Sequence, residues 1–361
     1  MTYPGSWKDR GEALHRLARV YRPLGMYDRA EHVLKEAVKS YYMALEQTDK
    51  KWPDVWALRA LSLYYLGRVY RETRKYDDAE KTLLLAIDNI DEALKLVDWN
   101  NADFLDIKGT ILSSLGMVYI KMGELEKAYK VLKESNSMHD RGLELVNYAN
   151  PCIWVNKGFA LGCLGHVCTK LKKYNEAESV LLDAIKSCKR ALEITKNMDP
   201  DAWNVLGFSQ CHLAQMYVAK NELDKAENAC DESLKSYGEA LRLTGNKHTY
   251  AIYGKSLVYL IKSKIYLKRG DKASSGETLR TSLEVACYGS DVFRWYLPSF
   301  ETFVEIAKHI KALYGSSIPE DIMQTYRECA NKILEIMPKR LFDMYTKKLK
   351  EIFGECWSSG S

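Results

Sequence analysis

The chain has 361 residues, 47% of them hydrophobic and 28% charged, so it has enough apolar material for a packed core and no composition typical of disorder. Its formal net charge of +5 is mildly basic, and the basic residues are not clustered as densely as in a dedicated nucleic-acid binder. No run of about 18 apolar residues and no hydrophobic leader is present, so we expect neither a membrane span nor a secretory signal. The nine scattered cysteines favour reduced thiols over a disulfide framework, which suits a cytoplasmic or nuclear protein.

The stretch LGRVYRETRKYDDAE at residues 66–80 returns in similar form along the chain, beginning at residues 17, 115, 164 and 213. The repetition keeps a fixed step of 49 residues in three series. A small residue recurs at Ala18, Gly67, Gly116, Gly165, Ala214 and Ser263, a second at Ala30, Ala79, Ala128, Ala177 and Ala226, and a large residue at Trp7, Trp56, Leu105, Trp154, Trp203 and Ile252. Self-similarity at a period of about 20 to 50 residues predicts a solenoid, in which each unit buries its apolar face against its neighbours.

Apolar residues within each unit follow a helical period, so we expect two amphipathic helices of about 20 residues per unit. In the second unit Leu66 and Tyr70 share one face, and Ala79 and Leu83 continue the spacing after the turn. Capping residues and helix breakers precede each first helix after the first unit. They are WPD (52–54), NNAD (100–103), NP (150–151), DPD (199–201) and GNKH (245–248). The pattern predicts six such units over residues 1–285.

The register ends after residue 285, although the segments that follow still have the pattern of amphipathic helices. These segments lack the small residues of the repeat. We therefore expect residues 286–354 to form a degenerate helical cap that covers the last apolar face of the array. We expect residues 355–361, ECWSSGS, to be a flexible tail.

The small residues of the repeat are expected on the facing sides of its two helices, where they let the backbones approach closely. They are Gly67, Gly116 and Gly165 with Ala79, Ala128, Ala177 and Ala226. The pattern LGxxY, followed nine residues after the tyrosine by alanine, resembles the tetratricopeptide repeat (TPR) over about residues 7–285. This resemblance implies an all-α fold, a right-handed α-solenoid of about six helix-turn-helix repeats with a C-terminal helical cap.

The period of this chain is longer than the usual TPR unit of about 34 residues. The excess of about 15 residues is close to four helical turns, so two extra turns in each helix would keep the same faces inward. Long-helix repeats of this kind resemble those of kinesin light chains and some signalling adaptors.

No motif of catalysis or of cofactor binding is present, because the chain has no phosphate-binding glycine loop, no GxSxG, no HExxH and no CxxC. We therefore expect no enzyme activity and no cofactor. One group of residues has the chemistry of zinc ligands: Cys163, His166, Cys168, Cys211 and His212. We favour packing over metal binding, because Cys168 occupies the slot of Tyr70 and Tyr119 and the spacing matches no structural zinc pattern.

Four tryptophans, Trp7, Trp56, Trp154 and Trp203, each stand seven residues before a packing position of the repeat. Tryptophan is enriched both in cores and at protein interfaces. Their place on the packing side of the helix favours a role in the core.

By resemblance to TPR arrays, the first helices line a concave face, on the side away from Leu66, Gly67 and Tyr70. The lining positions are His15, Arg19 and Arg22; Tyr64, Arg68 and Arg71; Ser113, Met117 and Ile120; Gly162, His166 and Thr169; Cys211, Gln215 and Val218; Leu260, Lys264 and Leu267. From these we expect His15, Arg19, Arg22, Tyr64, Arg68, Arg71, His166, Gln215 and Lys264 to bind the partner.

The lining is graded along the array. Its first two units are rich in arginine and aromatic residues, its middle is neutral, and its far end carries Lys264 among apolar residues. Guanidinium groups offer paired donors that suit carboxylates and phosphates. The sequence thus predicts a partner segment with acidic or phosphorylated residues near one end and apolar residues toward the other, where Leu260 and Leu267 lie.

The function expected is a non-enzymatic scaffold or adaptor that binds a peptide or helical segment of another protein. The lysine and asparagine clamp of TPR proteins that hold a chaperone C-terminus is absent, since Arg19 stands where that clamp has asparagine. An RNA-binding TPR solenoid is the alternative, against which the neutral middle of the lining argues, because RNA favours a groove that is basic throughout. A role as the sensor arm of a larger signalling protein is a third possibility.

Overall fold

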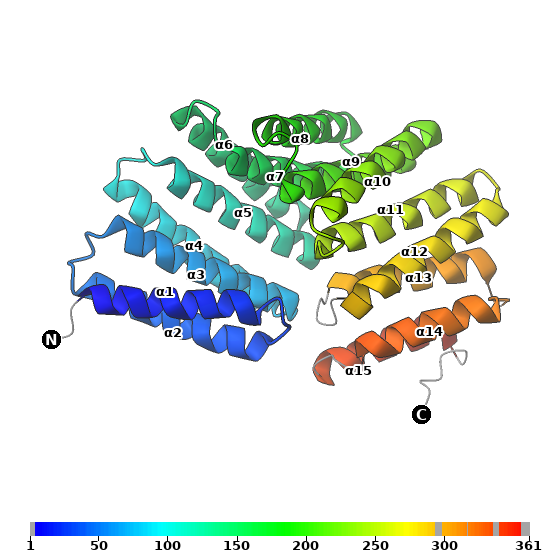
Figure 1. Ribbon diagram of the computed structural model, residues 1–361, viewed down its shortest axis with the longest axis horizontal. Helices are drawn as coiled ribbons and strands as arrows, with labels where there is room; N and C mark the ends of the chain where they lie inside the picture. The colour runs from blue at the N-terminus through cyan, green and yellow to red at the C-terminus, as the bar shows by residue number, and fades with distance from the viewer. Residues whose placement is uncertain (1–3, 293–297, 316, 335–338, 355–361) are drawn as a thin grey trace. The chain divides into compact units, whose positions relative to one another are not determined.

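The computed structural model describes residues 4–292, 298–315, 317–334 and 339–354. Within these ranges the chain forms fifteen α-helices and no strand, which confirms the predicted all-α repeat fold (Figure 1). The chain divides into two compact units, Met1–Asn197 (unit 1) and Met198–Ser361 (unit 2). The sequence did not predict this division. The tail expected at residues 355–361 lies outside the described residues.

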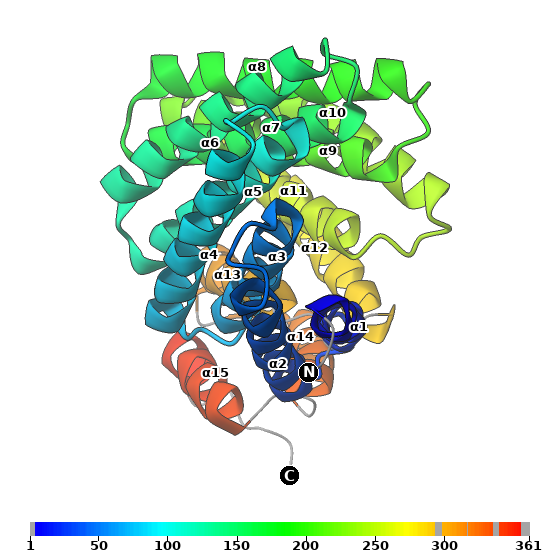
Figure 2. The same ribbon diagram turned by 90° about the vertical axis from the view of Figure 1, so that its left-hand side faces the viewer.

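Unit 1 consists of four antiparallel helical hairpins, each a first helix followed by a second helix. Figure 2 shows these hairpins stacked in chain order. The helices are α1 (Pro4–Tyr21), α2 (Tyr27–Glu46), α3 (Pro53–Glu72), α4 (Tyr76–Leu96), α5 (Ala102–Met122), α6 (Leu125–Leu145), α7 (Pro151–Lys170) and α8 (Tyr174–Ile194).

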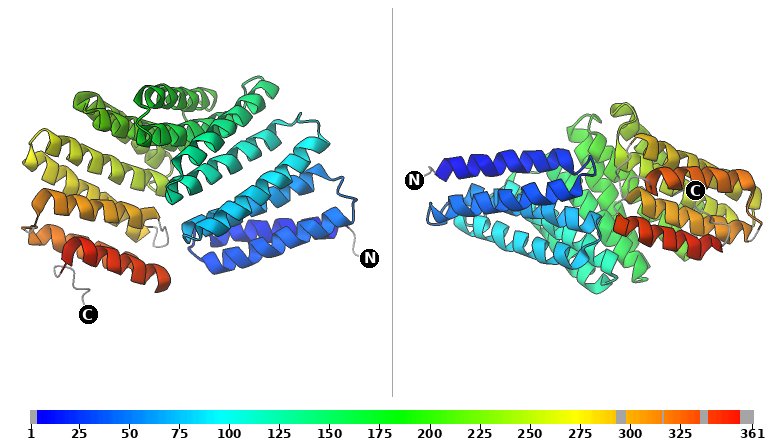
Figure 3. Two further views of the ribbon diagram at one scale, coloured as in Figure 1. Left: turned by 180° about the vertical axis from the view of Figure 1, so that it is seen from behind. Right: turned by 90° about the horizontal axis from the view of Figure 1, so that it is seen from below.

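Unit 2 continues with two further hairpins of the same length, and three shorter helices follow them. The helices are α9 (Pro200–Lys220), α10 (Leu223–Leu243), α11 (Thr249–Lys268), α12 (Lys272–Val292), α13 (Pro298–Tyr314), α14 (Glu320–Leu334) and α15 (Lys339–Phe353). Helix α13 packs against α11 and α12, and α14 and α15 pack against α13, so the shorter helices cover the end of the last hairpin. The left panel of Figure 3 shows these helices in orange and red.

The predicted capping residues do begin the first helices. The side chain of Asn101 accepts a hydrogen bond from the Phe104 amide at 3.0 Å, and that of Asp199 accepts from the Ala202 amide at 3.1 Å. His248 uses its ring nitrogen in the same way for α11, at 3.2 Å from the Ala251 amide. These acceptors satisfy amide groups that have no partner within the helix, so the helix starts are encoded locally.

Each hairpin closes around the small residues of the repeat. Gly67 in α3 packs on Leu83 in α4, and a β-carbon added to Gly67 would lie only 2.7 Å from the Leu83 Cγ. Gly116 meets Leu132 and Gly165 meets Leu181 in the same way. The alanines of the second helices, Ala79, Ala128, Ala177 and Ala226, are fully buried. The repeat spacing thus encodes a close approach of two helix backbones.

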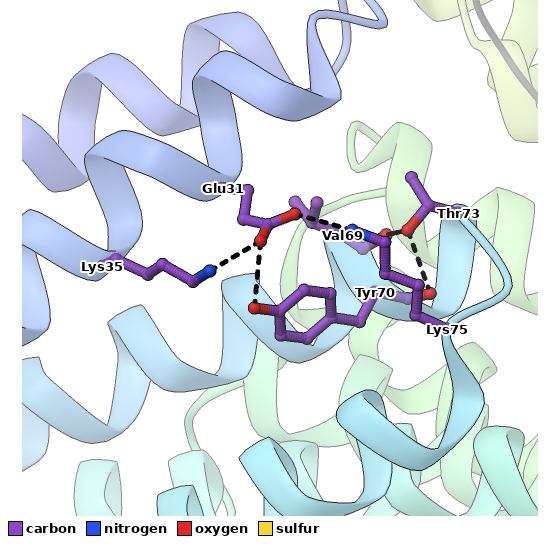
Figure 4. Close-up of polar contacts among 6 residues, drawn as sticks. All are labelled: Glu31, Lys35, Val69, Tyr70, Thr73 and Lys75. Atoms are coloured by element: carbon purple, nitrogen blue, oxygen red, sulfur yellow. Dashed lines mark hydrogen bonds and ion pairs between the residues drawn. The ribbon is translucent and has the colours of Figure 1, made fainter. Parts of the chain in front are cut away.

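In three of the first helices, α3, α5 and α11, a tyrosine is tied to a glutamate of the preceding second helix. Tyr70 Oη donates to Glu31 at 3.2 Å, and Lys75 and Lys35 bring their ammonium groups to the same carboxylate at 3.1 and 2.7 Å (Figure 4). Burial alone would raise the pKa of Glu31, but the hydrogen bonds from the two lysines lower it below its usual value. The same contact joins Tyr119 to Glu80 and Tyr266 to Glu227. We call this contact the tyrosine latch.

The tyrosine latch is replaced at the interface between the third and fourth hairpins, where the tyrosine lies on the second helix instead of the first. Cys168 fills the slot of Tyr70 and Tyr119, and Tyr129 stands in the register of Glu31 on the preceding second helix. Tyr129 Oη donates to Glu176 at 2.6 Å, and the Lys173 ammonium lies 4.2 Å from the centre of the Tyr129 ring. The aromatic ring has moved from one helix to its neighbour, and the smaller Cys168 is fully buried.

The four tryptophans, for which the sequence favoured a role in the core, are half-buried. Trp7 and Trp56 pack against the buried cluster that includes Tyr41 and Leu45. Trp56 Nε1 donates to the Lys50 carbonyl at 3.0 Å, and Trp154 makes the equivalent bond to the Tyr148 carbonyl. The indole nitrogen needs a polar partner, and the turn before each helix supplies it, so the ring covers the turn.

The expectation of reduced thiols throughout is wrong for one pair. Cys287 of α12 and Cys329 of α14 form a disulfide, with their Cα atoms 5.4 Å apart. Both residues lie outside the repeat slots, so the 49-residue register gave no sign that α12 and α14 pack together. Six other cysteines are outside any disulfide: Cys152, Cys163, Cys168, Cys188, Cys211 and Cys230. In the described ranges, none of the helices combines the length and the apolar composition of a bilayer span.

Candidate functional site

The first helices form the inner layer of unit 1. Helix α1 contacts α3, α3 contacts α5 and α5 contacts α7, whereas the second helices in the described part of unit 1 make no comparable contacts with one another. Helices that approach each other more closely lie on the concave side of a curved array. The expected binding surface is therefore the exposed side of α1, α3, α5 and α7.

One of the three predicted series of lining positions is buried for most of its length. Ser113 is 2% exposed and its hydroxyl lies 2.8 Å from that of Ser135 in α6, so it faces the second helix of its own hairpin. Gly162 is also buried, and in unit 2 Cys211 and Leu260 are 2% and 0% exposed. The predicted apolar end of the lining at Leu260 is thus part of the core. Successive residues of an α-helix point about 100° apart, so a shift of the predicted lining by one residue moves a side chain from the solvent-exposed face to the packed face.

His15 and Arg22, both expected to bind the partner, make contacts between the first two hairpins. His15 Nδ1 lies 2.9 Å from the Ser62 hydroxyl, and burial together with the Arg19 charge lowers the pKa of His15 to about 4. Arg22 forms an ion pair with Glu72 at 2.7 Å, and the two side chains are only 17% and 5% exposed. Removing one partner of such a pair leaves a buried charge, so its first role is structural.

Three further arginines, Arg19, Arg68 and Arg71, lie on the same surface. Arg19 is exposed. Arg68 Nη1 donates to Tyr64 Oη at 3.1 Å, and its guanidinium stacks on the rings of Tyr64 and Tyr65 at 5.5 and 5.9 Å. The stacking fixes the plane of the guanidinium group before any ligand arrives.

Arg71 extends along the surface toward the third and fourth hairpins. Its Nη1 lies 3.2 Å from the sulfur of Met117 in α5. Burial raises the pKa of the Cys163 thiol in α7 to about 12, and the Arg71 charge partly offsets that shift. One arginine therefore places its positive charge in reach of three first helices. Tyr65, which sequence reasoning did not select, could have been found from its position three residues before Arg68 on the same helix.

The remaining predicted binding residues are half-buried. His166 lies in α7 of unit 1. In unit 2, the Gln215 side-chain oxygen lies 3.0 Å from Nδ1 of His212, one turn earlier in α9. Burial lowers the pKa of Lys264, and the nearby carboxylate of Glu305 in α13 opposes that shift. Lys264 thus faces the helix that covers α11, so it is not on an open surface.

The cysteines and histidines considered as zinc ligands take packing positions. Burial raises the pKa of the Cys168 thiol to about 11 and that of Cys163 to about 12, so both are protonated at neutral pH. Zinc binding would require each thiol to lose its proton in a buried, apolar site. Among the described residues, no group of three or more histidine, cysteine, aspartate or glutamate side chains is arranged to hold a metal ion.

Two parts of the chain match a known repeat family. Residues 11–42 and 110–138 match the family model described as tetratricopeptide repeat. No curated protein matches the sequence. Among solved structures, BtubC (BKLC) from P. vanneervenii has a TM-score of 0.51 at 13% identity, over 72% of this chain and 90% of its own.

Two further solved structures are similar at lower scores. The TPR-like repeats of a putative kinesin light chain from Podosopora anserina have a TM-score of 0.39 at 16% identity, over 67% of this chain and 100% of their own. A tetratricopeptide repeat protein from Parabacteroides merdae has a TM-score of 0.40 at 16% identity, over 94% of this chain and 99% of its own.

Proposed function

We propose that this chain, parts of which match the tetratricopeptide repeat, a repeat typical of protein-interaction scaffolds, binds an acidic or phosphorylated segment of a partner protein on the concave side of unit 1. The observation that carries the proposal is the group of Arg19 on α1 with Arg68 and Arg71, one turn apart, on the adjoining α3. We name it the arginine surface. Each guanidinium can offer two parallel donors to a carboxylate or a phosphate.

The chemistry of the arginine surface favours protein over RNA. Tyr64 and Tyr65 are engaged by the Arg68 guanidinium and by His15, which leaves their faces partly occupied for base stacking. The next first helix presents Met117 and Ile120, which carry no charge. A groove for single-stranded RNA needs a basic track with open aromatic faces along its length. An adaptor role follows from this surface. We also propose a cytoplasmic location, which agrees with the five buried cysteines outside the disulfide, whereas the Cys287–Cys329 disulfide is of a kind that is rare in cytosolic proteins.

Charge reversal on the arginine surface tests the proposal. We expect fluorescently labelled acidic and phosphoserine peptides to bind the protein, and Arg19→Glu with Arg68→Glu to weaken binding at least tenfold, about 1.4 kcal/mol. Binding should also fall as salt rises above about 0.1 M, where the Debye length drops below about 10 Å. Anisotropy titrations at two salt concentrations measure both effects.

A matched control reverses two exposed charges elsewhere. Lys186→Glu with Lys189→Glu on α8 changes the net charge by the same amount on the opposite layer of unit 1. This variant should bind the peptides as the wild type does. Equal weakening in both variants, or none in the arginine variant, would mean that the arginines are an ordinary solvated surface. Melting curves of both variants separate lost binding from lost folding.

A further inference from the structure

The outer side of α1 exposes repeat positions that are buried in the other hairpins of unit 1. Leu17 is 38% exposed and Val20 is 54% exposed. One repeat later, Leu66 and Val69 are 5% and 0% exposed. The same two positions in α5 and α7 are 4% exposed or less, and Ala13 is exposed where its counterparts are fully buried.

These positions are covered in every later hairpin of unit 1 by the preceding second helix. Helix α2 packs on α3, α4 on α5 and α6 on α7. Within the described residues no second helix precedes α1, which is the outermost helix of unit 1 in the right panel of Figure 3. The α1 surface is therefore continuous in register with an established interface of the fold, and that interface shows which chemistry fits it. We name Ala13, Leu17, Val20 and Tyr21 the open face.

The polar part of the interface also has its counterpart on α1. Tyr21 stands in the register of Tyr70 and Tyr119, which donate to Glu31 and Glu80 of the preceding helices. The guanidinium of Arg29 lies 5.9 Å from the centre of the Tyr21 ring. A carboxylate that reached the Tyr21 hydroxyl would thus approach a positive charge, as Glu31 does between its two lysines.

The charge of α1 indicates which kind of helix would bind the open face. Helix α1 carries more basic than acidic residues, and the Arg16 side chain beside the open face is 78% exposed. Helix α4, which covers the equivalent face of α5, has six acidic and two basic residues. An acidic helix is therefore favoured by the field around α1.

We propose that the open face binds an acidic amphipathic helix of a partner protein, whose aliphatic side chains cover Leu17 and Val20 and whose glutamate accepts a hydrogen bond from Tyr21. The binding follows the helix-in-groove mode, with contacts spaced three and four residues apart. The site is distinct from the arginine surface, because α1 presents Arg19 on another side of the helix.

A second copy of this chain fits the open face less well. Helix α8, with four acidic and three basic residues, is less acidic than α4. The other second helices, α2, α4, α6, α10 and α12, already pack on the helix that follows them, and each would have to leave it before it could bind α1. A different protein pays no such cost.

The test uses a synthetic peptide with the sequence of α4, residues 76–96, as the probe, since α4 covers the counterparts of the open face on α5. We expect the labelled peptide to bind the full chain, and Leu17→Asp with Val20→Asp to weaken binding at least tenfold. Tyr21→Phe and a peptide with Glu80→Ala should each weaken binding about tenfold, and the combination no further, because each removes one partner of the same hydrogen bond.

Two control variants and one measurement of oligomeric state keep the outcome decisive. Leu182 of α8 is 50% exposed, and Leu182→Asp should leave peptide binding unchanged. Arg68→Glu with Arg71→Glu should also leave it unchanged, so a failure of the arginine surface would not affect this result. No binding of the α4 peptide, or equal binding by the Leu17 and Val20 variant, would refute the proposal. Sedimentation velocity that showed a dimer lost in that variant would refute it as well, because the occupant would then be a second copy.

Discussion

The close approach of the two helices in each hairpin makes one sharp prediction about Gly67. A β-carbon at this position would lie 2.7 Å from Cγ and 2.8 Å from Cδ2 of Leu83, a side chain that is fully buried in α4. Overpacking of this kind costs about 1 to 3 kcal/mol. The helix propensity of alanine over glycine returns about 1 kcal/mol. We therefore expect Gly67→Ala to lower the free energy of unfolding by up to about 2 kcal/mol.

The sign should change once Leu83 is removed. Leu83→Ala alone should cost about 3 to 5 kcal/mol, because it leaves a cavity in the hairpin core. In that background Gly67→Ala no longer meets Cγ, so only the propensity term remains and the substitution should stabilise by about 1 kcal/mol. The coupling between the two sites is then about 1 to 3 kcal/mol.

Urea unfolding followed by circular dichroism measures this cycle. Gly238→Ala in α10 is the matched control, because a β-carbon there has no atom within 4 Å, and it should stabilise the otherwise wild-type protein by about 1 kcal/mol. The reasoning is refuted if Gly67→Ala changes the free energy of unfolding by the same amount with and without Leu83.

Further predictions concern the half-buried tryptophans, the histidine between hairpins and the cysteines. Trp154→Ala should lower the free energy of unfolding by about 2 kcal/mol, roughly half the cost at a fully buried site, and Lys186→Ala by much less; equal melting temperatures would contradict this. Because the pKa of His15 is about 4 in the fold and higher when unfolded, stability should fall as pH drops from about 6.5 to 4, and less so in His15→Gln. Purified protein should contain no stoichiometric zinc, and Cys163→Ser with Cys211→Ser should fold without added metal, as elemental analysis and melting curves will check.

The sequence was enough to predict the parts of the fold that depend on local spacing. Gly67 and Ala79 recur every 49 residues because each hairpin needs the same close contact, and Asn101 and Asp199 begin helices through hydrogen bonds to amides two or three residues away. Contacts within a repeat are short-range in sequence, so periodicity alone specifies them. For the same reason the all-α repeat fold follows from the spacing of the apolar and small residues.

The features that the sequence did not reveal depend on which residues meet between elements. Arg22 stood in the predicted lining, yet its partner Glu72 lies 50 residues away and outside the lining series. Ser113 and Met117 are four residues apart, so their side chains differ in direction by about 40° around the helix, and Ser113 meets Ser135 of the second helix. The disulfide of Cys287 and Cys329 required knowledge that α12 packs on α14, which no repeat position encodes.

The central claim is that the arginine surface of unit 1 binds an acidic segment of another protein. Its most direct test is capture from a cell extract, with and without nuclease, by the wild type and by the variant with Arg19→Glu and Arg68→Glu, followed by mass spectrometry. We predict a protein that is retained after nuclease treatment, that carries an acidic or phosphorylated segment, and that the variant fails to capture. Capture that is lost on nuclease treatment, or that is equal for both forms of the protein, would contradict the claim.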